Sequence, residues 1–201
     1  MGSLTQCSWF LVHPEGTRLL ALGSVGIATM TKTASICPVV PGMALSIRPI
    51  TPDDLGFLAD LYASTRMAEL AVTDWDAAQK QSFLAGQFQA QHAYYQEYYR
   101  DAAFDVILLD TTPIGRIYLD RWPDELRVVE IALLPHYQRR GIGSAFVAAI
   151  VAEAESASIA VRLHVEVFNP ALAWYARLGF QPVDTHGVYY LMEWLPEVMH
   201  A

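Results

Sequence analysis

The chain has 201 residues, of which 53% are hydrophobic, 11% aromatic and 17% charged, and this is the composition of a folded globular domain and not of a disordered segment. Its 21 acidic residues outnumber its 13 basic residues, which argues against the basic surface that a nucleic-acid-binding protein needs. The same balance mildly favours cationic ligands such as amines.

The first 42 residues are expected to form a poorly structured extension outside the folded domain. Their periodicity is weak, and they end in the turn-forming residues Pro-Val-Val-Pro-Gly at positions 38–42. Met43 directly precedes the first strand-like segment, so the domain is predicted to span residues 43–201, with Met43 as a candidate natural start. Both cysteines, Cys7 and Cys37, lie in the extension, so no disulfide framework is expected in the core and a cytoplasmic location is favoured.

The longest apolar stretch, residues 19–30, is too short to cross a membrane. A membrane helix needs about 20 apolar residues, whereas this stretch has about a dozen and includes Gly and Ser. The segment before it carries Glu15 and Arg18 instead of the basic run of a secretory signal. We therefore expect no membrane insertion and no secretion.

From residue 45 onward, helical and strand-like segments alternate. A strand over residues 45–50 is followed by Thr51 and Pro52, which supply an N-cap and a first-turn proline for a helix that runs to about Arg66. Apolar and aromatic residues at spacings of three and four predict a longer helix over residues 77–100, with one unusually aromatic face. A hairpin follows, with strands over residues 104–109 and 116–119 joined by a turn over residues 110–115.

The second half of the chain continues the alternation. A strand over residues 126–134 leads through a glycine-containing turn into a helix over residues 144–158, and a strand over residues 161–167 comes next. Asn169 and Pro170 begin a short helix that ends at Gly179, and a strand over residues 188–194 closes the domain. This order predicts a mixed α/β (α+β) domain built around one sheet.

The turn between the third strand and the third helix has the sequence Gln-Arg-Arg-Gly-Ile-Gly-Ser over residues 138–144. Backbone N–H groups at the start of a helix have no partner inside the helix, and with the helix dipole they favour an anionic phosphate. Gly141 and Gly143 allow the backbone to approach a ligand closely, and Arg139 and Arg140 add charged donors. The turn is therefore a candidate phosphate site.

Three other interpretations of this turn compete with a phosphate site of this kind. A dinucleotide-binding fingerprint requires a third glycine where the chain has Phe146, and an acidic residue about 20 positions on, which is missing. A P-loop requires Gly-Lys-Ser/Thr, and the turn contains no lysine. A tight turn with glycines for geometry alone and solvated arginines stays open at this point.

The pattern Gln-x-x-Gly-x-Gly after a strand that ends in proline resembles the signature of the GNAT acetyltransferase superfamily. A second segment, Asn169 to Phe180, resembles the family's other signature, an Asn followed by a helix with a Tyr four residues before Gly-Phe. Residues 47–49 (Ile-Arg-Pro) with Asp53 are similar to its usual first strand and helix. The resemblance covers residues 44–195 and implies a single domain with a central, mostly antiparallel mixed sheet flanked by about four helices.

The resemblance also implies the ligand. Acetyl-CoA would be the acyl donor, with no metal, and its pyrophosphate would bind at the turn. The pantetheine arm would pair with the backbone of the preceding strand. The acyl-donor-binding residues that it implies are Ala132, Leu133, Leu134, Gln138, Arg139, Arg140, Gly141, Ile142, Gly143, Ser144 and Asn169.

Two residues are the candidates for catalysis. By resemblance, Tyr175 is the general acid that protonates the departing CoA sulfur, the alternative being a packed aromatic side chain. Glu130 is the candidate base, because a carboxylate is a poor structural choice in the apolar strand Val-Val-Glu-Ile-Ala-Leu-Leu, although a salt-bridged or edge-facing Glu stays open. His164, Glu166 and His92 are weaker candidates.

The acceptor pocket is expected to come from the first two helices and their connection. These segments contain acidic and aromatic residues that suit a cation, although packed tyrosines and solvated acids are an equal alternative. The residues concerned are Arg66, Glu69, Asp74, Trp75, Asp76, Tyr94, Tyr95, Tyr98 and Tyr99.

The predicted function is N-acetylation of a primary amine by direct attack in a ternary complex. The expected partner is a small-molecule or peptide amine, with no nucleic acid and no membrane, and a homodimer is the assembly considered. A non-catalytic domain that binds or senses acyl-CoA is the alternative. The identity of the amine is left open.

Overall fold

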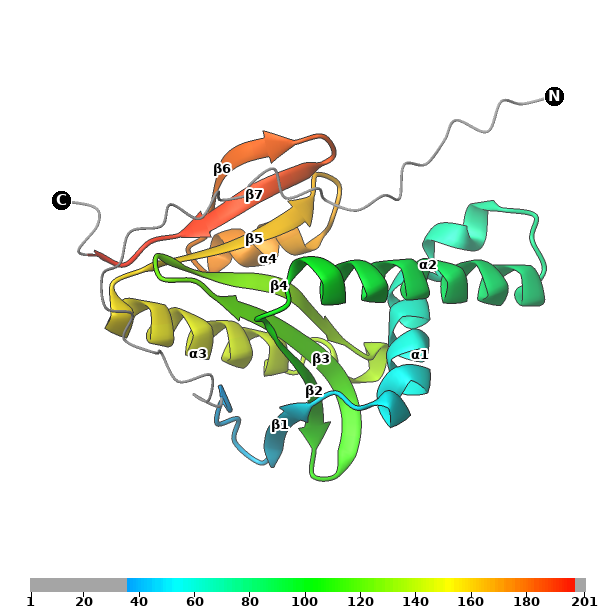
Figure 1. The fold of residues 1–201 in the computed structure, drawn as a ribbon, viewed down its shortest axis with the longest axis horizontal. Coiled ribbons are helices and arrows are strands. Elements are labelled where there is room, and N and C mark those ends of the chain that lie inside the picture. Colours follow the sequence, from blue (N-terminus) through cyan, green and yellow to red (C-terminus); the bar gives the residue numbers. More distant parts are fainter. Residues whose placement is uncertain (1–35, 198–201) are drawn as a thin grey trace.

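A seven-stranded sheet in the order β1-β2-β3-β4-β5-β7-β6 forms the centre of the computed structural model, which describes residues 36–197 (Figure 1). All neighbouring strands are antiparallel except β4 and β5, which are parallel. The predicted mixed, mostly antiparallel sheet is confirmed. The strands are β1 (Leu45–Pro49), β2 (Ala103–Leu109), β3 (Thr112–Arg121), β4 (Glu125–Leu133), β5 (Ala160–Glu166), β6 (Gln181–His186) and β7 (Tyr189–Trp194).

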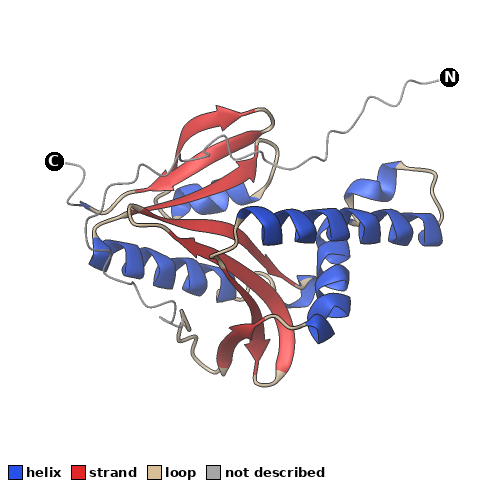
Figure 2. Ribbon diagram, in the orientation of Figure 1, coloured by secondary structure: helices blue, strands red, loops and turns tan. Residues whose placement is uncertain are grey.

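Within residues 36–197, four α-helices and three short 3-10 helices accompany the sheet. Figure 2 colours the helices blue and the strands red. None of the helices within residues 36–197 has both the length and the apolar character of a membrane span. The α-helices are α1 (Leu55–Arg66), α2 (Ala77–Tyr98), α3 (Ile142–Ala157) and α4 (Ala171–Arg177), and the 3-10 helices are η1 (Pro52–Asp54), η2 (Glu69–Val72) and η3 (Pro135–Tyr137).

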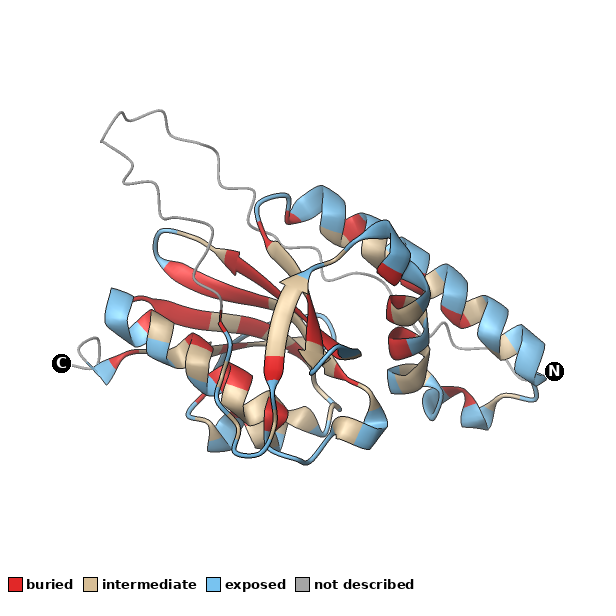
Figure 3. Ribbon diagram, turned by 90° about the horizontal axis from the view of Figure 1, so that it is seen from below, coloured by how far each residue is buried: buried red, intermediate tan, exposed pale blue. Residues whose placement is uncertain are grey.

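The two faces of the sheet have different partners because side chains alternate along a strand. On β3, Ile117 and Leu119 belong to the main core with Phe146 and Ile150 of α3. On the opposite face, Tyr118 stacks edge-on against Tyr95 of α2 at 6.2 Å between ring centroids. Figure 3 shows buried residues along the strands and on the inner sides of the helices, and exposed residues on the outer sides.

Thr51 and Pro52 begin the 3-10 helix η1, which leads directly into α1, so the predicted N-cap belongs to η1 and the N-cap position of α1 is Asp54. The backbone N–H and the hydroxyl of Thr51 both donate to Asp54 Oδ2, at 2.7 and 2.9 Å. Asp54 also pairs with both terminal nitrogens of Arg48 at 2.7 Å, and this pairing holds the pKa of the carboxyl well below its usual value. The ion pair fixes α1 against the end of β1.

Strand β6 was missed by the sequence analysis. All six of its residues are exposed, because it forms the edge of the sheet and pairs only with β7. It contains Pro182 and Asp184, which protect an edge from further pairing but weaken the strand pattern in the sequence. Because β6 lies at the edge of the sheet, it lacks the alternation of apolar and polar residues on which strand prediction depends.

The β2–β3 turn is shorter than predicted. Leu109 pairs with Thr112, so only residues 110 and 111 form the loop, and Asp110 adopts φ 55°. The expected turn over residues 110–115 is wrong in length because Pro113 and Gly115 lie inside β3 and not in the loop. Two-residue hairpin loops favour positive φ, which Asp tolerates better than most residues.

Most of the predicted N-terminal extension, residues 1–35, lies outside the described residues. Its final part differs from the prediction, because the Ile36 side chain is buried in the main core. The Cys37 thiol donates to the carbonyl of Leu45 at 3.0 Å, and Val40 forms an isolated bridge with Met43. The core therefore includes residues upstream of Met43.

The parallel strands β4 and β5 separate before they end. Their pairing runs from Glu125 with Ala160 to Val128 with Leu163 and stops there, whereas β4 continues to Leu133 beside β3. A β-bulge coincides with this point, because Tyr118 pairs with Glu130 and Leu119 with Val128, leaving Val129 as the extra residue. The gap in pairing leaves one edge of the β4 backbone available at the centre of the sheet.

Candidate active site

A cavity of about 280 Å³ lies where β4 and β5 separate. It is bounded by the sheet, by α1 and α2 on one side and by α4 on the other. Its aromatic wall is made of Tyr62, Tyr94, Tyr95, Tyr99, Trp174, Tyr175 and Tyr189. Its charged or titratable residues are Arg66, Arg127, Glu130, His164 and Glu166.

The glycine turn has the geometry of an anion site. Gly141 has φ +82°, precedes α3 directly, and has no heavy atom within 4 Å of the position of an added Cβ. The first N–H groups of this 16-residue helix have no intrahelical partner, so they face the turn as free donors. The turn thus has the geometry of a phosphate site, and the binding of a diphosphate by the backbone of residues 141–144 stays a prediction.

Several side chains of the turn already have partners within the protein. Gln138 Nε2 donates to the carbonyl of Leu133 at 2.8 Å, which ties the turn to the end of β4. Ile142 is buried in the core, so only its backbone can meet a ligand. Arg140 lies 3.3 Å from His136 Nε2 and over the ring of Tyr137 at 5.6 Å.

Arg139 and Arg140 are both exposed on the turn, and Arg139 adopts φ 58°. Their positions are compatible with the predicted role as charged donors to phosphate. For the acyl-donor-binding residues as a group, the role stays a prediction.

The α4 segment joins the turn to the cavity. Trp174 Nε1 donates to Ser144 Oγ at 3.0 Å, and the Trp174 ring lies 3.5 Å from the position of a Cβ added at Gly143. Gly179 ends this segment with φ +93°, as predicted for a C′ glycine. The two sequence signatures are therefore in direct contact.

Tyr175 lies on the wall of the cavity and is 7% exposed. Its ring packs 4.6 Å from Trp174 and 5.6 Å from Phe180. Burial raises the pKa of its hydroxyl above the ordinary value, and the charge of Glu130 raises it further. The hydroxyl therefore keeps its proton at neutral pH, as a general acid must. The ring is packed, as the alternative interpretation expected, and the role of Tyr175 as general acid stays a prediction.

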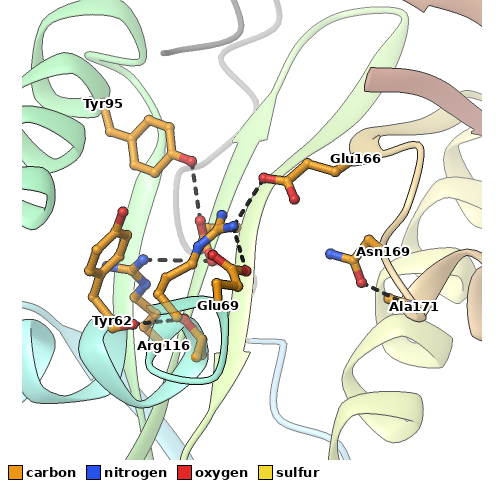
Figure 4. Close-up of polar contacts among 10 residues, drawn as sticks. Tyr62, Glu69, Tyr95, Arg116, Glu166, Asn169 and Ala171 are labelled. Carbon is orange, nitrogen blue, oxygen red and sulfur yellow. Dashed lines mark hydrogen bonds and ion pairs between the residues drawn. The ribbon is translucent and has the colours of Figure 1, made fainter. Parts of the chain in front are cut away.

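Glu130 lines the cavity from β4 between two donors, Tyr95 and Arg116, which Figure 4 labels. The Tyr95 hydroxyl donates to Oε2 at 3.1 Å. Arg116 Nη2 lies 3.6 Å from Oε1 and donates to Gln91 Oε1 at 2.8 Å. The carboxylate that sequence analysis singled out in an apolar strand is thus neutralised by a buried arginine while it remains 22% exposed toward the cavity.

Asn169 lines the cavity, and its side chain caps α4. Asn169 Oδ1 accepts from the Ala171 N–H at 2.9 Å (Figure 4). The helix itself begins at Ala171 with Pro170 in the cap position, so the predicted capping by Asn169 comes from one residue further out. Its amide N–H₂ makes no contact that competes with this cap and can donate to a ligand.

Two arginines, Arg127 and Arg66, make polar contacts with other residues that surround the cavity. Arg127 Nη1 lies 3.4 Å from His164 Nδ1, so the neutral ring carries its proton on Nε2. Burial lowers the pKa of His164 to about 4, with the charge of Arg127 adding to the effect. At the rim, Arg66 Nη1 lies 3.2 Å from Glu69 Oε1 and 3.1 Å from Glu166 Oε1, joining α1 to β5.

The predicted acceptor pocket was partly wrong. Asp74, Trp75 and Asp76 lie at the exposed connection before α2 and do not line the cavity, and Asp76 accepts from Gln79 N at 2.8 Å as the N-cap of α2. Tyr98 is 52% exposed because it lies on the outer side of α2. Arg66, Tyr94, Tyr95 and Tyr99 line the cavity as predicted, and Glu69 joins them through Arg66.

The other candidate bases differ in whether they reach the cavity. His92 is not among the cavity residues; it stacks on Phe88 at 5.5 Å, and burial lowers its pKa. His164 and Glu166 share a face of β5, as expected from alternation, and both reach the cavity. Arg127 lies beside His164 and Arg66 pairs with Glu166, and the role of Glu130 as the base stays a prediction.

Four functional candidates escaped the sequence analysis: Tyr62, Arg116, Arg127 and Tyr189. Arg116 and Arg127 are nearly inaccessible to solvent, at 2% and 8% exposure. Arg116 lies 3.6 Å from the cavity carboxylate of Glu130, whereas Arg127 pairs with Glu125 and lies beside His164. An arginine within a strand pattern was the only signal in the sequence. Each arginine has a partner on another strand or helix, so this local pattern did not distinguish a functional arginine from a structural one.

Comparisons with known proteins agree with this geometry. Residues 66–180 match the sequence model of the acetyltransferase (GNAT) family. No curated protein matches the chain significantly. Among solved structures, the PaiA N-acetyltransferase of Thermoplasma acidophilum in complex with coenzyme A is 21% identical, covering 76% of this chain and 99% of that one with a TM-score of 0.58.

Acetyltransferases of Streptococcus agalactiae and Thermus thermophilus are similar at 17% identity each, with TM-scores of 0.55 and 0.54. They cover 78% and 75% of this chain and 99% and 96% of their own. At this identity the structures establish a shared fold. Because the family match spans more than half of the chain and includes β4, the glycine turn and Tyr175, the chain belongs to the acetyltransferase (GNAT) family.

Proposed function

We propose that the protein transfers an acetyl group from acetyl-CoA to the nitrogen of a primary amine by direct attack in a ternary complex. The observation that carries the proposal is the meeting of Glu130 and Tyr175 in one cavity at the separation of β4 and β5. The phosphate-fitting turn adjoins the same cavity through Trp174 and Ser144. An acyl donor held at the turn would thus present its reactive end between a base and an acid.

The binding part of the proposal rests on backbone groups. The turn at residues 141–144 offers N–H donors to phosphate, and the unpaired edge of β4 over residues 129–133 offers N–H and C=O groups to an extended amide-containing arm. Acetyl-CoA supplies a thioester, whose carbonyl carbon is the electrophile. Trp174 and the buried side chain of Leu133 shield this region from water.

The chemistry needs two proton transfers. Glu130 accepts a proton from the amine, directly or through a water, so that the nitrogen can form the new C–N bond. Tyr175 gives its proton to the sulfur as the C–S bond breaks, which balances the proton that Glu130 gains. The pKa of Tyr175, raised by burial and by Glu130, keeps that proton available until the thiolate forms.

The charges of the cavity favour a small amine over a polycation. Among the residues that line the cavity, the cations Arg66 and Arg127 balance the carboxylates Glu130 and Glu166, so the wall is nearly neutral. Tyrosine rings dominate the remaining surface and suit an ammonium through their faces. A volume of about 280 Å³ lies at the lower end of small-molecule sites.

The test is release of free CoA thiol from acetyl-CoA in the presence of a library of primary amines, with mass spectrometry of the products. A product heavier by one acetyl group on nitrogen supports the proposal. Binding of acetyl-CoA by calorimetry without transfer to any amine of the library would favour a non-catalytic acyl-CoA-binding domain instead. Gly143→Glu is the control with a blocked donor site.

A further inference from the structure

Both oxygens of Glu130 are engaged by groups that no sequence signature contains. Oε2 accepts from the Tyr95 hydroxyl of α2 at 3.1 Å, and Oε1 lies 3.6 Å from Arg116 Nη2 of β3. The two donors come from different elements and approach different oxygens (Figure 4). They therefore restrict the carboxylate in rotation as well as in position.

Arg116 is a buried charged residue, and its burial requires compensating interactions. Its side chain is 2% exposed, and a buried guanidinium is costly unless it is paired and hydrogen-bonded. Arg116 is opposite Ala132 in the β3–β4 ladder, so Glu130 is its diagonal neighbour on the same face of the sheet. Gln91 Oε1 takes a second contact at 2.8 Å and fixes the guanidinium from α2.

Tyr95 approaches from the helix that covers this face. Its ring lies edge-on to Tyr118 at 6.2 Å and to Tyr99 at 6.0 Å, which holds the hydroxyl in place over the sheet. Burial raises the pKa of Tyr95 well above its ordinary value, and the charge of Glu130 adds to this effect. The hydroxyl therefore stays a donor across the working pH range.

We propose that Arg116 and Tyr95 are positioning residues for the proposed reaction, which hold the Glu130 carboxylate in the orientation that receives the proton of the acceptor amine. The inference rests on the proposed function. It assigns no contact with substrate to either residue, because both act through Glu130. It also accounts for a buried arginine that contributes nothing to the apolar core.

The tests compare Tyr95→Phe, Arg116→Met and Arg116→Lys with the unaltered protein. Tyr95→Phe removes one hydrogen bond to a charged group, and we expect kcat to fall about 10- to 100-fold. The kcat of Arg116→Met should fall at least as far. Arg116→Lys should recover part of this loss, because lysine restores the positive charge but not the planar guanidinium that can donate from two nitrogens. Tyr98→Phe and Arg100→Met are the matched controls, because both residues are exposed and lie away from the cavity.

A pH profile separates positioning from a structural role. Loss of the neighbouring cation or of the donor disfavours the ionised carboxylate, so the acidic limb of kcat/KM should move to higher pH in Arg116→Met and in Tyr95→Phe. The charged and titratable groups that act on Glu130 come from four elements, namely Tyr62 of α1, Tyr95 of α2, Arg116 and Tyr118 of β3, and Tyr175 of α4. A structural defect alone would lower activity without moving this limb.

A double-mutant cycle gives the sharpest outcome. In a Glu130→Gln background, Tyr95→Phe should change kcat by less than about 2-fold, because its partner has already lost the charge. Additive losses would overturn the proposal, as would an unmoved acidic limb in Tyr95→Phe. If Arg116→Met does not fold, as judged by thermal melting, Tyr95→Phe carries the test alone.

Failure of the proposed function is recognised separately. It would appear as an unaltered protein that acetylates no amine of the library, before any variant is compared. An active protein whose Tyr95 and Arg116 variants keep full kcat and the same pH profile would instead refute the positioning roles and leave the acetyltransferase intact.

Discussion

Trp174 Nε1 donates a hydrogen bond to Ser144 Oγ at 3.0 Å, so the α4 segment is fastened to the first turn of α3. Ser144 belongs to the predicted phosphate turn, and Trp174 precedes the predicted general acid. The site that would hold the acyl donor and the cavity that would hold the acceptor therefore share one wall. Substitutions at the turn should therefore affect binding of the acyl donor, and substitutions in the cavity should affect turnover.

Gly143→Glu should abolish most acetyl-CoA binding, and Gly143→Ala should not. The Glu carboxylate would stand where the helix N-terminus attracts phosphate, and repulsion of this kind should weaken affinity by a factor of about 100 or more. An alanine Cβ would lie 3.5 Å from the Trp174 ring, an ordinary contact. Isothermal titration with acetyl-CoA checks both, and equal affinity of the two variants would contradict a phosphate site here.

Tyr175→Phe should lower kcat by about 10²- to 10⁴-fold, the range of a lost general acid. The affinity for acetyl-CoA should stay within about 3-fold, because the ring still packs against Trp174 and Phe180. Steady-state turnover and calorimetry measure the two quantities. A variant that turns over at the rate of the unaltered protein would remove Tyr175 from the mechanism.

Glu130→Gln should lower kcat/KM for the amine by about 10²-fold or more while the fold is kept, since Gln preserves the shape but cannot accept a proton. The matched control is Glu97→Gln on the exposed side of α2. At high pH the deficit should shrink, because a larger share of the amine is already neutral. A deficit that is the same at every pH would mean that Glu130 does not act as the base.

Stability should decrease as the pH falls from about 6.5 to about 4 because of His164. Its folded pKa is lowered to about 4 from an ordinary 6.5, first by burial and then by Arg127, so the unfolded chain takes up the proton more readily. The contribution is fully present above pH 6.5 and is lost as the pH falls toward 4. Urea unfolding at a series of pH values measures this loss, and His164→Gln should have a shallower dependence over the same window.

Asn169→Ala should destabilise the protein by about 0.5 to 2 kcal/mol through loss of the cap on α4. Asn169→Asp keeps the oxygen that accepts from Ala171 and should retain most of that stability. Thermal or urea unfolding checks the cap. If Asn169 also binds the acyl donor through its amide N–H₂, the Asp variant will be stable and yet bind acetyl-CoA more weakly.

Sequence alone predicted much of the fold because the central elements carry regular patterns. The β2, β3, β4 and β5 segments have continuous or alternating apolar residues, and the glycines and caps mark the ends of α3 and α4. The edge strand β6 lacks this pattern, since all its residues face solvent and its pairing partner determines it. A strand that forms because it pairs with a neighbouring strand, and not because of its own sequence pattern, is not predicted from local sequence.

The candidate site divides in the same way. The glycine turn and the Asn169–Phe180 segment are local features, because consecutive residues determine their backbone conformation. Glu130 can also be recognised locally, because it is a carboxylate in an otherwise apolar strand. Asp74 and Asp76 looked equally suited to a cation, yet they lie at an exposed helix start because Asp76 serves as the cap of α2. Composition could not distinguish a capping acid from a binding one.

What the sequence by itself determined was the succession of the main elements other than β6, the phosphate-type turn and the two residues proposed for proton transfer. Only the tertiary structure decided that Arg116 and Tyr95 hold Glu130, that Trp174 joins the turn to the cavity, and that Arg66 reaches β5. Arg66 and Glu166 are 100 positions apart, and Arg116 and Gln91 are 25 apart. Contacts of this kind depend on which strands the fold places side by side, and neither partner has a local pattern that reveals the other.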